Sequence, residues 1–325
     1  MNWRRAGDRA TLAFYSQLIM ETVILGDNLL RVSRLAYGCW RLGAAPDRRD
    51  ADKQAIIAAF EAGYTLFDQA DIYGRGEAEK IFGEVLREVP GLRGRVTVVT
   101  KAGVRRADDP PGSPYHYNLS GEHLVRSCES SLQRLGVETV DLFLLHRADW
   151  LADPADVAAA FSRLKQSGKA RFFGVSNCRP SLVGALQAAC PMPLVVHQIE
   201  ISLGQLAAFE DGTLDQCLAM KLTPMAWSPL GGGQFADGAR RLLKYQEGYR
   251  TEGVVPLLDE LAKLHGATRS AVALAWLLKH PAGILPIVGS THPQHIRDAT
   301  RATEIVLSRE QWYRLLTAAR GEPLP

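Results

Sequence analysis

The chain has 325 residues, of which 46% are hydrophobic and 22% are charged. These proportions are close to those of globular proteins, so they exclude a disordered, collagenous or coiled-coil chain. The 38 basic and 35 acidic side chains leave a net charge of +3, and the basic residues are scattered, which argues against a nucleic-acid-binding surface. No apolar run approaches the roughly 18 residues of a membrane-spanning helix, so no membrane partner is expected.

The cysteines indicate a reducing compartment. The five cysteines are odd in number, widely spaced and never in a C-x-x-C pair, which disfavours a disulfide framework and a structural zinc site. We therefore expect a cytoplasmic protein.

The first 20 residues are expected to be a loose extension ahead of one domain spanning 21–325. A short apolar run in this extension is interrupted by polar residues and is followed by no small-residue cleavage site, so a secretory signal is disfavoured. An alternative start at Met20 is left open.

The domain begins with a predicted β-hairpin at 22–33. Its turn is expected at Gly26, Asp27 and Asn28, because glycine and Asx residues tolerate the positive φ that such turns need. We expect this hairpin to cap one end of the domain. Eight short apolar runs follow and predict strands at 35–38, 65–68, 96–100, 140–145, 170–175, 194–199, 222–227 and 284–289.

Helix signals separate these strands. Ser120 is a predicted N-cap and Gly136 a predicted stop, while Asp153 and Pro154 open another helix that Gly168 closes. Helices are expected at about 51–62, 77–88, 120–135, 154–167, 180–189, 213–220, 254–264, 268–279 and 293–301, with an extra carboxyl-terminal helix at 308–319.

This alternation indicates a parallel sheet, which could be an open doubly wound sheet or a closed barrel. The first strand is followed by Gly38 to Gly43 with no glycine-rich dinucleotide fingerprint. Eight strand-helix units without that fingerprint favour a (β/α)8 TIM barrel with an amino-terminal β-hairpin and an extra carboxyl-terminal helix.

Polar residues gather at the carboxyl ends of the predicted strands, where such barrels carry their active sites. One histidine, one aspartate and one lysine do not suit a metal site, because a charged ammonium cannot ligate a cation, so no metal is expected. No serine or cysteine there has an obvious paired base. The strand-end residues are Trp40, Asp68, Lys101, His146, Ser176, Asn177, Gln198, Trp227, Ser228 and Ser290.

Four of these residues or their neighbours suit proton transfer to a carbonyl oxygen. A free tyrosine has a pKa of about 10, which a neighbouring cation lowers. Lys101 could act in this way on Tyr73, and Asp68 could hold the ammonium in place. His146 could orient the substrate and stabilise its developing negative charge. An isolated aspartate-lysine pair is also compatible with a purely structural ion pair.

Six motifs occur in order along the chain: FDQADIYG (67–74), TK (100–101), LLHR (144–147), GVSN (174–177), WSPL (227–230) and GS (289–290). They resemble the successive motifs of the aldo-keto reductase superfamily, and the resemblance covers about 22–320. The stretches QIEIS (198–202) and WSPLGGG (227–233) are most similar to a bacterial subgroup of predicted oxidoreductases. The resemblance implies a carbonyl reductase in which Tyr73 is the general acid, tuned by Lys101. It also implies that Asp68 is the partner of the lysine and that His146 orients the substrate.

The resemblance further implies a nicotinamide cofactor. Ser176, Asn177 and Gln198 would hold its carboxamide, and Trp227 would stack on its ring where many members have tyrosine. The remaining residues implied to contact the cofactor are Gly38, Trp40, Ser228, Pro229, Leu230, Gly289, Ser290, Thr291 and His295.

The choice of cofactor depends on the last loop. Many relatives that prefer NADPH have lysine or arginine there, whereas this chain has His292 and His295, with Arg297 and Arg301 nearby. Histidine is only partly charged near neutrality, so the grip on a 2′-phosphate is expected to be weaker. NADPH is still the expected cofactor, with NADH as the alternative.

The long, proline-rich loop at 104–119 is expected to shape the substrate pocket. Its Tyr115, His116 and Tyr117, together with Trp40, are the predicted pocket residues, although a merely mobile surface loop would have the same composition. The resemblance implies an NADPH-dependent reductase of a small aldehyde or ketone, and we expect a monomer. The alternatives are a nicotinamide-binding regulatory protein with little turnover and an unrelated barrel hydrolase or lyase.

Overall fold

The computed structural model describes residues 20–26, 30–238 and 246–324. The expected extension, apart from its last residue, lies outside these ranges, as do Asp27 and Asn28 of the expected hairpin turn. In the described part of the chain, no helix is both long and apolar enough to cross a membrane.

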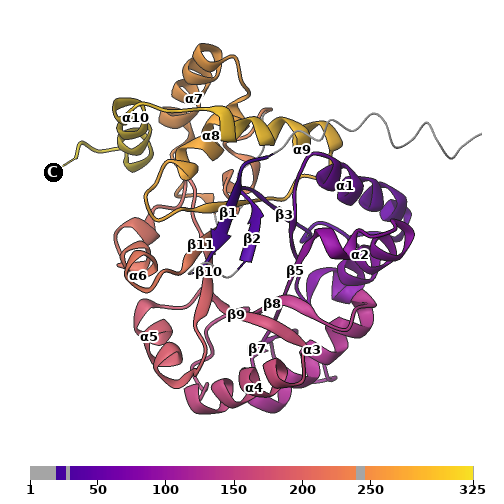
Figure 1. Ribbon diagram of the computed structural model, residues 1–325. Coiled ribbons are helices and arrows are strands. Elements are labelled where there is room, and N and C mark those ends of the chain that lie inside the picture. The colour runs from indigo at the N-terminus through magenta and orange to yellow at the C-terminus, as the bar shows by residue number, and fades with distance from the viewer. Residues whose placement is uncertain (1–19, 27–29, 239–245, 325) are drawn as a thin grey trace, which may run out of the picture.

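Eight parallel strands close into a barrel in the order β10-β11-β12-β3-β4-β5-β8-β9, which confirms the predicted (β/α)8 TIM barrel (Figure 1). Each strand agrees with its predicted run to within two residues at either end. The runs read as continuous apolar stretches because side chains fill the barrel and helices cover it. The strands are β3 Ala36–Gly38, β4 Leu66–Asp68, β5 Thr97–Ala102, β8 Val140–Leu145, β9 Ala170–Ser176, β10 Leu194–Glu200, β11 Thr223–Trp227 and β12 Leu285–Val288.

Helices surround the barrel (Figure 1). The predicted caps act as expected, since Ser120 accepts a hydrogen bond from His123 N at 3.4 Å and Asp153 accepts one from Ala155 N at 2.9 Å. Gly136 ends its helix in the left-handed region at φ 65°. The helices are α1 Arg49–Glu61, α2 Glu77–Glu88, α3 Gly121–Leu135, α4 Pro154–Gln166, α5 Pro180–Ala189, α6 Thr213–Met220, α7 Thr251–His265, α8 Arg269–Leu278, α9 Pro293–Thr300 and α10 Arg309–Arg320.

The extra carboxyl-terminal helix α10 packs beside α7 and α8 (Figure 1). Trp312 of α10 stacks on Trp276 of α8 with ring centroids 5.2 Å apart. Each indole N–H donates to the main-chain oxygen of the other tryptophan, at 3.1 and 3.0 Å. These contacts fix α10 against the barrel while satisfying both indole N–H groups.

The amino-terminal hairpin, β1 Thr22–Leu25 and β2 Leu30–Ser33, closes one end of the barrel as predicted. Leu25 and Val32 are buried and join the apolar cluster inside the barrel. Ser33 N donates to Thr65 Oγ1 at 2.8 Å and Gly26 N donates to Thr223 Oγ1 at 3.3 Å. Because Thr65 and Thr223 stand at the starts of strands, the hairpin lies at the amino-terminal end, opposite the expected active site.

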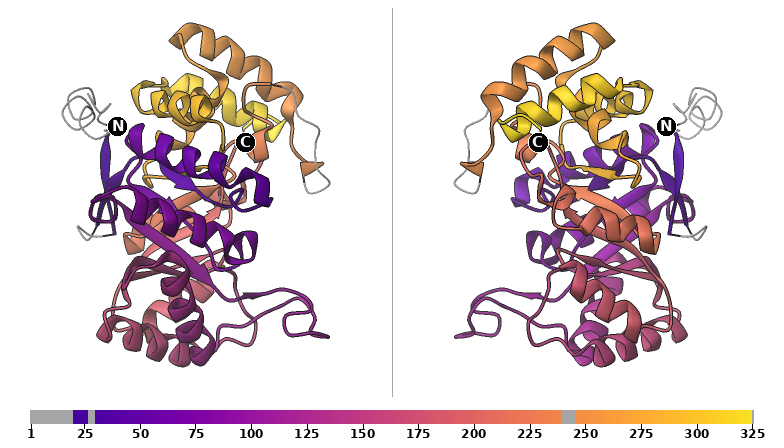
Figure 2. Two further views of the ribbon diagram at one scale, coloured as in Figure 1. Left: turned by 90° about the vertical axis from the view of Figure 1, so that its right-hand side faces the viewer. Right: turned by 90° about the vertical axis from the view of Figure 1, so that its left-hand side faces the viewer.

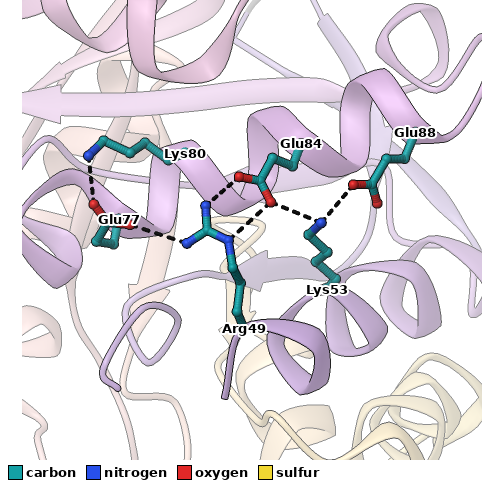
Figure 3. Close-up of polar contacts among 6 residues, drawn as sticks. All are labelled: Arg49, Lys53, Glu77, Lys80, Glu84 and Glu88. Carbon is teal, nitrogen blue, oxygen red and sulfur yellow. Dashed lines mark hydrogen bonds and ion pairs between the residues drawn. The ribbon is translucent and has the colours of Figure 1, made fainter. Parts of the chain in front are cut away.

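A network of ion pairs joins the first two helices (Figure 3). Arg49 of α1 bonds to Glu84 of α2 and approaches Glu77 at 3.3 Å, while Lys53 reaches Glu84 at 2.9 Å and Glu88 at 2.6 Å. Hydrogen bonds from Arg49 and Lys53 lower the pKa of Glu84 to about 2. The shared carboxylate therefore couples α1 to α2 near neutral pH.

The loop after β5 contains a short hairpin that the sequence did not reveal. Its strands are β6 Val104–Arg105 and β7 His116–Tyr117, and Figure 2 shows the loop between them extending away from the barrel. The pairing involves only two residues on each side, which is too short to leave a recognisable alternation in the sequence.

Candidate active site

Lys101, near the carboxyl end of β5, is the centre of a group of buried polar side chains. Its Nζ donates to Asp68 Oδ2 at 2.8 Å, to the main-chain oxygen of Gln69 at 2.7 Å and to Tyr73 Oη at 2.9 Å. All three N–H groups of the ammonium are therefore used. Lys101 is fully buried and Asp68 is only 3% exposed, so this group is shielded from water.

The position of Tyr73 is set by the turn after β4. Asp71 N donates to Lys101 O at 3.1 Å, which ties this turn to β5. Gly74, directly after the tyrosine, has φ 56°, and a Cβ there would lie 3.0 Å from Gly43 O. A glycine is needed at this close approach, and it keeps Tyr73 over the end of the barrel.

Burial and charge shift the pKa values of this group in opposite directions. Burial raises the pKa of Tyr73 above its usual value, although Lys101 lowers it. For Lys101 itself, burial lowers the pKa, but Asp68 and Tyr73 outweigh this effect and leave the pKa raised. The expectation that the lysine favours the phenolate is thus correct in direction, but burial is the larger effect. The phenol keeps its proton near neutral pH and can donate it.

His146, directly after β8, lies beside this group. Its main-chain N–H donates to Ala102 O at 2.8 Å, and its ring meets the Tyr73 ring edge-on with centroids 5.8 Å apart. Burial, with Lys101 and Arg147, holds the pKa of His146 well below its usual value. Nδ1 has no hydrogen-bond partner among the described residues. The imidazole is therefore neutral and can donate an N–H to an uncharged substrate oxygen.

The residues expected around the nicotinamide form a connected set. Gln198 Nε2 donates to Asp68 Oδ1 at 2.8 Å across the barrel, since β10 and β4 stand opposite each other. Asn177 Nδ2 donates to Ser176 Oγ at 2.6 Å, and Trp227 Nε1 donates to Asn177 Oδ1 at 2.9 Å. Asn177 has φ 55°, an uncommon conformation for a non-glycine residue that is concentrated at functional sites.

The turn after β11 carries the next three expected residues, Ser228, Pro229 and Leu230. Ser228 also has a positive φ, of 48°, and its carbonyl accepts a hydrogen bond from Gly231 N at 2.8 Å. The chain therefore bends sharply at the carboxyl ends of both β9 and β11, which places the following residues over the barrel rim.

The start of α9 has the chemistry of an anion site. No side chain caps this helix, so its first-turn N–H groups keep their positive partial charge. His292 and His295 lie together there, with ring centroids 4.6 Å apart, and His292 N donates to Ser290 Oγ at 3.2 Å. Arg48, the last residue of the short 3-10 helix Pro46–Arg48 before α1, reaches Thr291 Oγ1 at 3.3 Å. These residues fit a phosphate group, and Arg48 adds a cation that the sequence did not single out.

Trp40 lies in the loop after β3, and this residue is 63% exposed. The Arg41 guanidinium lies 5.5 Å from the Trp40 ring centroid and donates to Gly289 O at 2.7 Å, bridging to the loop after β12. Gly38 is buried, and a Cβ there would lie 2.7 Å from Ile287 Cγ2. The glycine is thus required by packing between β3 and β12.

Aromatic residues cluster on the expected substrate loop. Tyr115 and Tyr117 meet edge-on at 5.8 Å, and Tyr117 stacks with Trp150 from the loop after β8 at 6.2 Å. His116 Nδ1 lies 2.8 Å from Pro114 O, inside its own loop. The structure therefore joins Tyr115 and Tyr117 to Trp150, which the sequence did not single out.

Arg147, which sequence reasoning did not single out, lies beside Trp227. Its guanidinium lies 5.5 Å from the centroid of the Trp227 ring, and it makes no hydrogen bond or ion pair in the described part of the chain. Arg147 belongs to the motif LLHR and follows His146, but the sequence alone indicated no role for it. A guanidinium held by an aromatic face keeps its N–H groups available for a substrate oxygen.

Comparisons with known proteins identify the family of this chain. The model of the Aldo/keto reductase family matches residues 34–319. The chain belongs to the aldo/keto reductase family. Members of this family act with nicotinamide cofactors on small carbonyl compounds, and the chain is accordingly an NAD(P)H-dependent oxidoreductase.

Similar proteins cover nearly the whole chain. The uncharacterized oxidoreductase YcsN of Bacillus subtilis is 40% identical over 94% of this chain and 100% of its own length. The 6-dehydroglucose reductase of Novosphingobium aromaticivorans is also 40% identical, over 93% of this chain and 96% of its own length. A solved structure of the thermostable aldo-keto reductase Tm1743 with the inhibitor epalrestat superposes with a TM-score of 0.78 at 27% identity, covering 92% of this chain and 100% of that chain.

Proposed function

We propose that this reductase uses NADPH to reduce the aldehyde group of a sugar-type substrate, with Tyr73 as the general acid. The observation that carries the proposal is the contact of Tyr73 Oη with Lys101 Nζ at 2.9 Å, inside a buried group that also includes Asp68. Support for the substrate class comes from Arg147 and from a 40% identical relative that is named a 6-dehydroglucose reductase.

In this proposal, the reduced nicotinamide supplies the hydride when it is bound. Tyr73 donates its phenolic proton to the carbonyl oxygen of the substrate as negative charge develops there. The Lys101 ammonium stabilises the resulting phenolate, and Asp68 holds the ammonium in position. The neutral His146 donates a hydrogen bond to the same oxygen and orients the carbonyl.

Cofactor contacts in this proposal follow the rim of the barrel. Ser176, Asn177 and Gln198 would hold the carboxamide, and Trp227 would lie against the nicotinamide ring. The uncapped start of α9 would hold the adenosine phosphate. Arg48 and His295 would favour the additional 2′-phosphate of NADPH over NADH.

The central experiment compares the wild type with Tyr73→Phe in the oxidation of NADPH by a glucose derivative oxidised to an aldehyde at C6. Tyr313→Phe, a tyrosine on α10 away from the site, is the matched control. We expect turnover to collapse in Tyr73→Phe alone, while NADPH binding, followed by tryptophan fluorescence, persists in all three proteins. A wild type that binds NADPH but reduces no carbonyl compound would contradict the proposal and favour a regulatory role.

The substrate class and the cofactor preference have separate tests. We expect Arg147→Gln to raise KM for the sugar aldehyde by about tenfold, and to change KM for benzaldehyde much less, because a guanidinium hydrogen bond to a hydroxyl is lost. Equal effects on both aldehydes would argue against a sugar-type substrate.

For the cofactor, we expect competitive binding to favour NADPH over NADH in the wild type, and we expect this preference to shrink in Arg48→Gln.

A further inference from the structure

A recess of about 630 Å³ opens at the amino-terminal end of the barrel, opposite the proposed active site. The amino-terminal hairpin and the segments that begin β4, β5, β8 and β9 enclose it. Its lining contains four arginines and a single carboxylate: Thr22, Arg31, Val32, Thr65, Arg93, Gly94, Arg95, Val96, Thr97, Thr139, Asp141 and Arg171.

The single carboxylate, Asp141, is already fully engaged. Oδ2 receives Arg93 Nη1 at 3.0 Å and the main-chain N–H of Val98 at 2.9 Å, while Oδ1 receives Arg171 Nη1 at 3.0 Å. Asp141 is only 3% exposed, so it lies beneath the recess and not on its open side. One negative charge is therefore shared by two guanidinium groups, and the lining keeps a surplus of positive charge.

Two of the arginines are positioned by aromatic rings. The Arg95 guanidinium lies 4.5 Å from the Phe60 ring centroid, and that of Arg171 lies 5.6 Å from the Phe172 ring centroid. Stacking holds a guanidinium without using its N–H groups. Within the described ranges, the side chain of Arg95 makes no hydrogen bond and no ion pair, and Arg171 uses one nitrogen on Asp141. The recess thus has N–H donors without acceptors.

We propose that this recess binds a small, multiply charged anion of the phosphate class. A planar guanidinium presents paired donors that match two phosphate oxygens, and several arginines around one recess suit a ligand with more than one phosphate group. The volume lies within the range of about 300–1,000 Å³ that is usual for small-molecule sites. The catalytic residues lie at the other ends of the same strands, so this site is separate from the one that is proposed to bind the cofactor.

The test is isothermal titration calorimetry of the full chain with sodium tripolyphosphate at low ionic strength. Arg95→Gln/Arg171→Gln removes two charges from the recess. Arg309→Gln is the matched control. The Arg309 guanidinium also stacks on an aromatic ring, 5.4 Å from the Tyr313 centroid, but Arg309 lies on α10 and not in the recess. Urea unfolding of each variant checks that the fold is unchanged.

We expect the double variant to bind tripolyphosphate about tenfold more weakly than the wild type, with two exposed charge pairs lost. Arg309→Gln should bind as the wild type does, and binding should weaken with added sodium chloride because the charges are exposed. Binding that survives unchanged in the double variant would place the anion elsewhere, such as at the start of α9, and overturn the proposal. Absence of binding by the wild type would also overturn it.

Discussion

The buried group around Lys101 predicts that stability and catalysis can be separated by substitution. In Lys101→Met, the ammonium is lost and the Asp68 carboxylate, 3% exposed, retains only Gln198 as a side-chain partner at 2.8 Å. Removing one partner of a buried ion pair costs about 3–5 kcal/mol, because the other charge is left in a low dielectric. We expect this loss in the free energy of unfolding of Lys101→Met.

The double variant Asp68→Asn/Lys101→Met removes both charges at once. It should recover most of the loss, to within about 1–2 kcal/mol of the wild type, because no uncompensated charge remains buried. Its reductase activity should stay as low as that of Lys101→Met, because Tyr73 still lacks the ammonium that contacts it at 2.9 Å. The assay is urea unfolding at pH 7, followed by circular dichroism, together with the rate of NADPH oxidation.

The matched control is Lys80→Met, which breaks the pair with Glu77 at 2.6 Å on the surface, where the two side chains are 50% and 38% exposed. An exposed pair contributes at most about 1 kcal/mol, so this control should remain close to the wild type. If Lys101→Met were no less stable than Lys80→Met, or if the double variant were no more stable than Lys101→Met, the description of a desolvated pair would be refuted.

Three further predictions concern stability. Glu84→Gln should lower the free energy of unfolding by about 1 kcal/mol at pH 7, and this difference should vanish as the pH falls from 4.5 towards the folded-state pKa of about 2, measured by urea titration at each pH. Burial, and to a smaller degree Glu79, raises the pKa of Asp71 to about 7. The free energy of unfolding of the wild type should therefore fall by about 2 kcal/mol relative to that of Asp71→Asn as the pH rises from 5 to 8. Parallel pH profiles of the two proteins would contradict this. Gly83→Ala should destabilise by about 1–3 kcal/mol, since its Cβ would lie 2.5 Å from Leu135 O, whereas Gly253→Ala, 3.6 Å from its nearest neighbour, should be neutral or stabilising in thermal unfolding.

Most of the fold could be predicted from the sequence because local signals and burial agree. Strand runs are continuous and apolar where both faces are covered, and caps such as Ser120 and Gly136 mark helix ends. The prediction was wrong where the local signal is weak. Helix α7 starts at Thr251, three residues before the predicted position, because Gly253 lowers the helix propensity of its first turn.

The site shows a similar division. The strand-end pattern indicated Asp68, Lys101 and His146, because a barrel places its strand ends on one rim. The contacts of Arg147 with Trp227 and of Trp150 with Tyr117 were not predicted. Such contacts depend on loop conformation and leave no periodic signal in the sequence. The direction of the pKa of Tyr73 also depended on burial, which a sequence does not supply.

The hydrogen bond between Gln198 and Asp68 crosses the barrel between two halves of the chain. The first half, through the loop after β8, carries all four proposed catalytic side chains, whereas β9 to β12 and their loops carry most residues proposed to hold the cofactor. A chain cut between these halves would yield one fragment with the proton-transfer groups and another with the nucleotide-binding groups. Turnover would then require both fragments in one reassembled barrel, so its return on mixing would report their association.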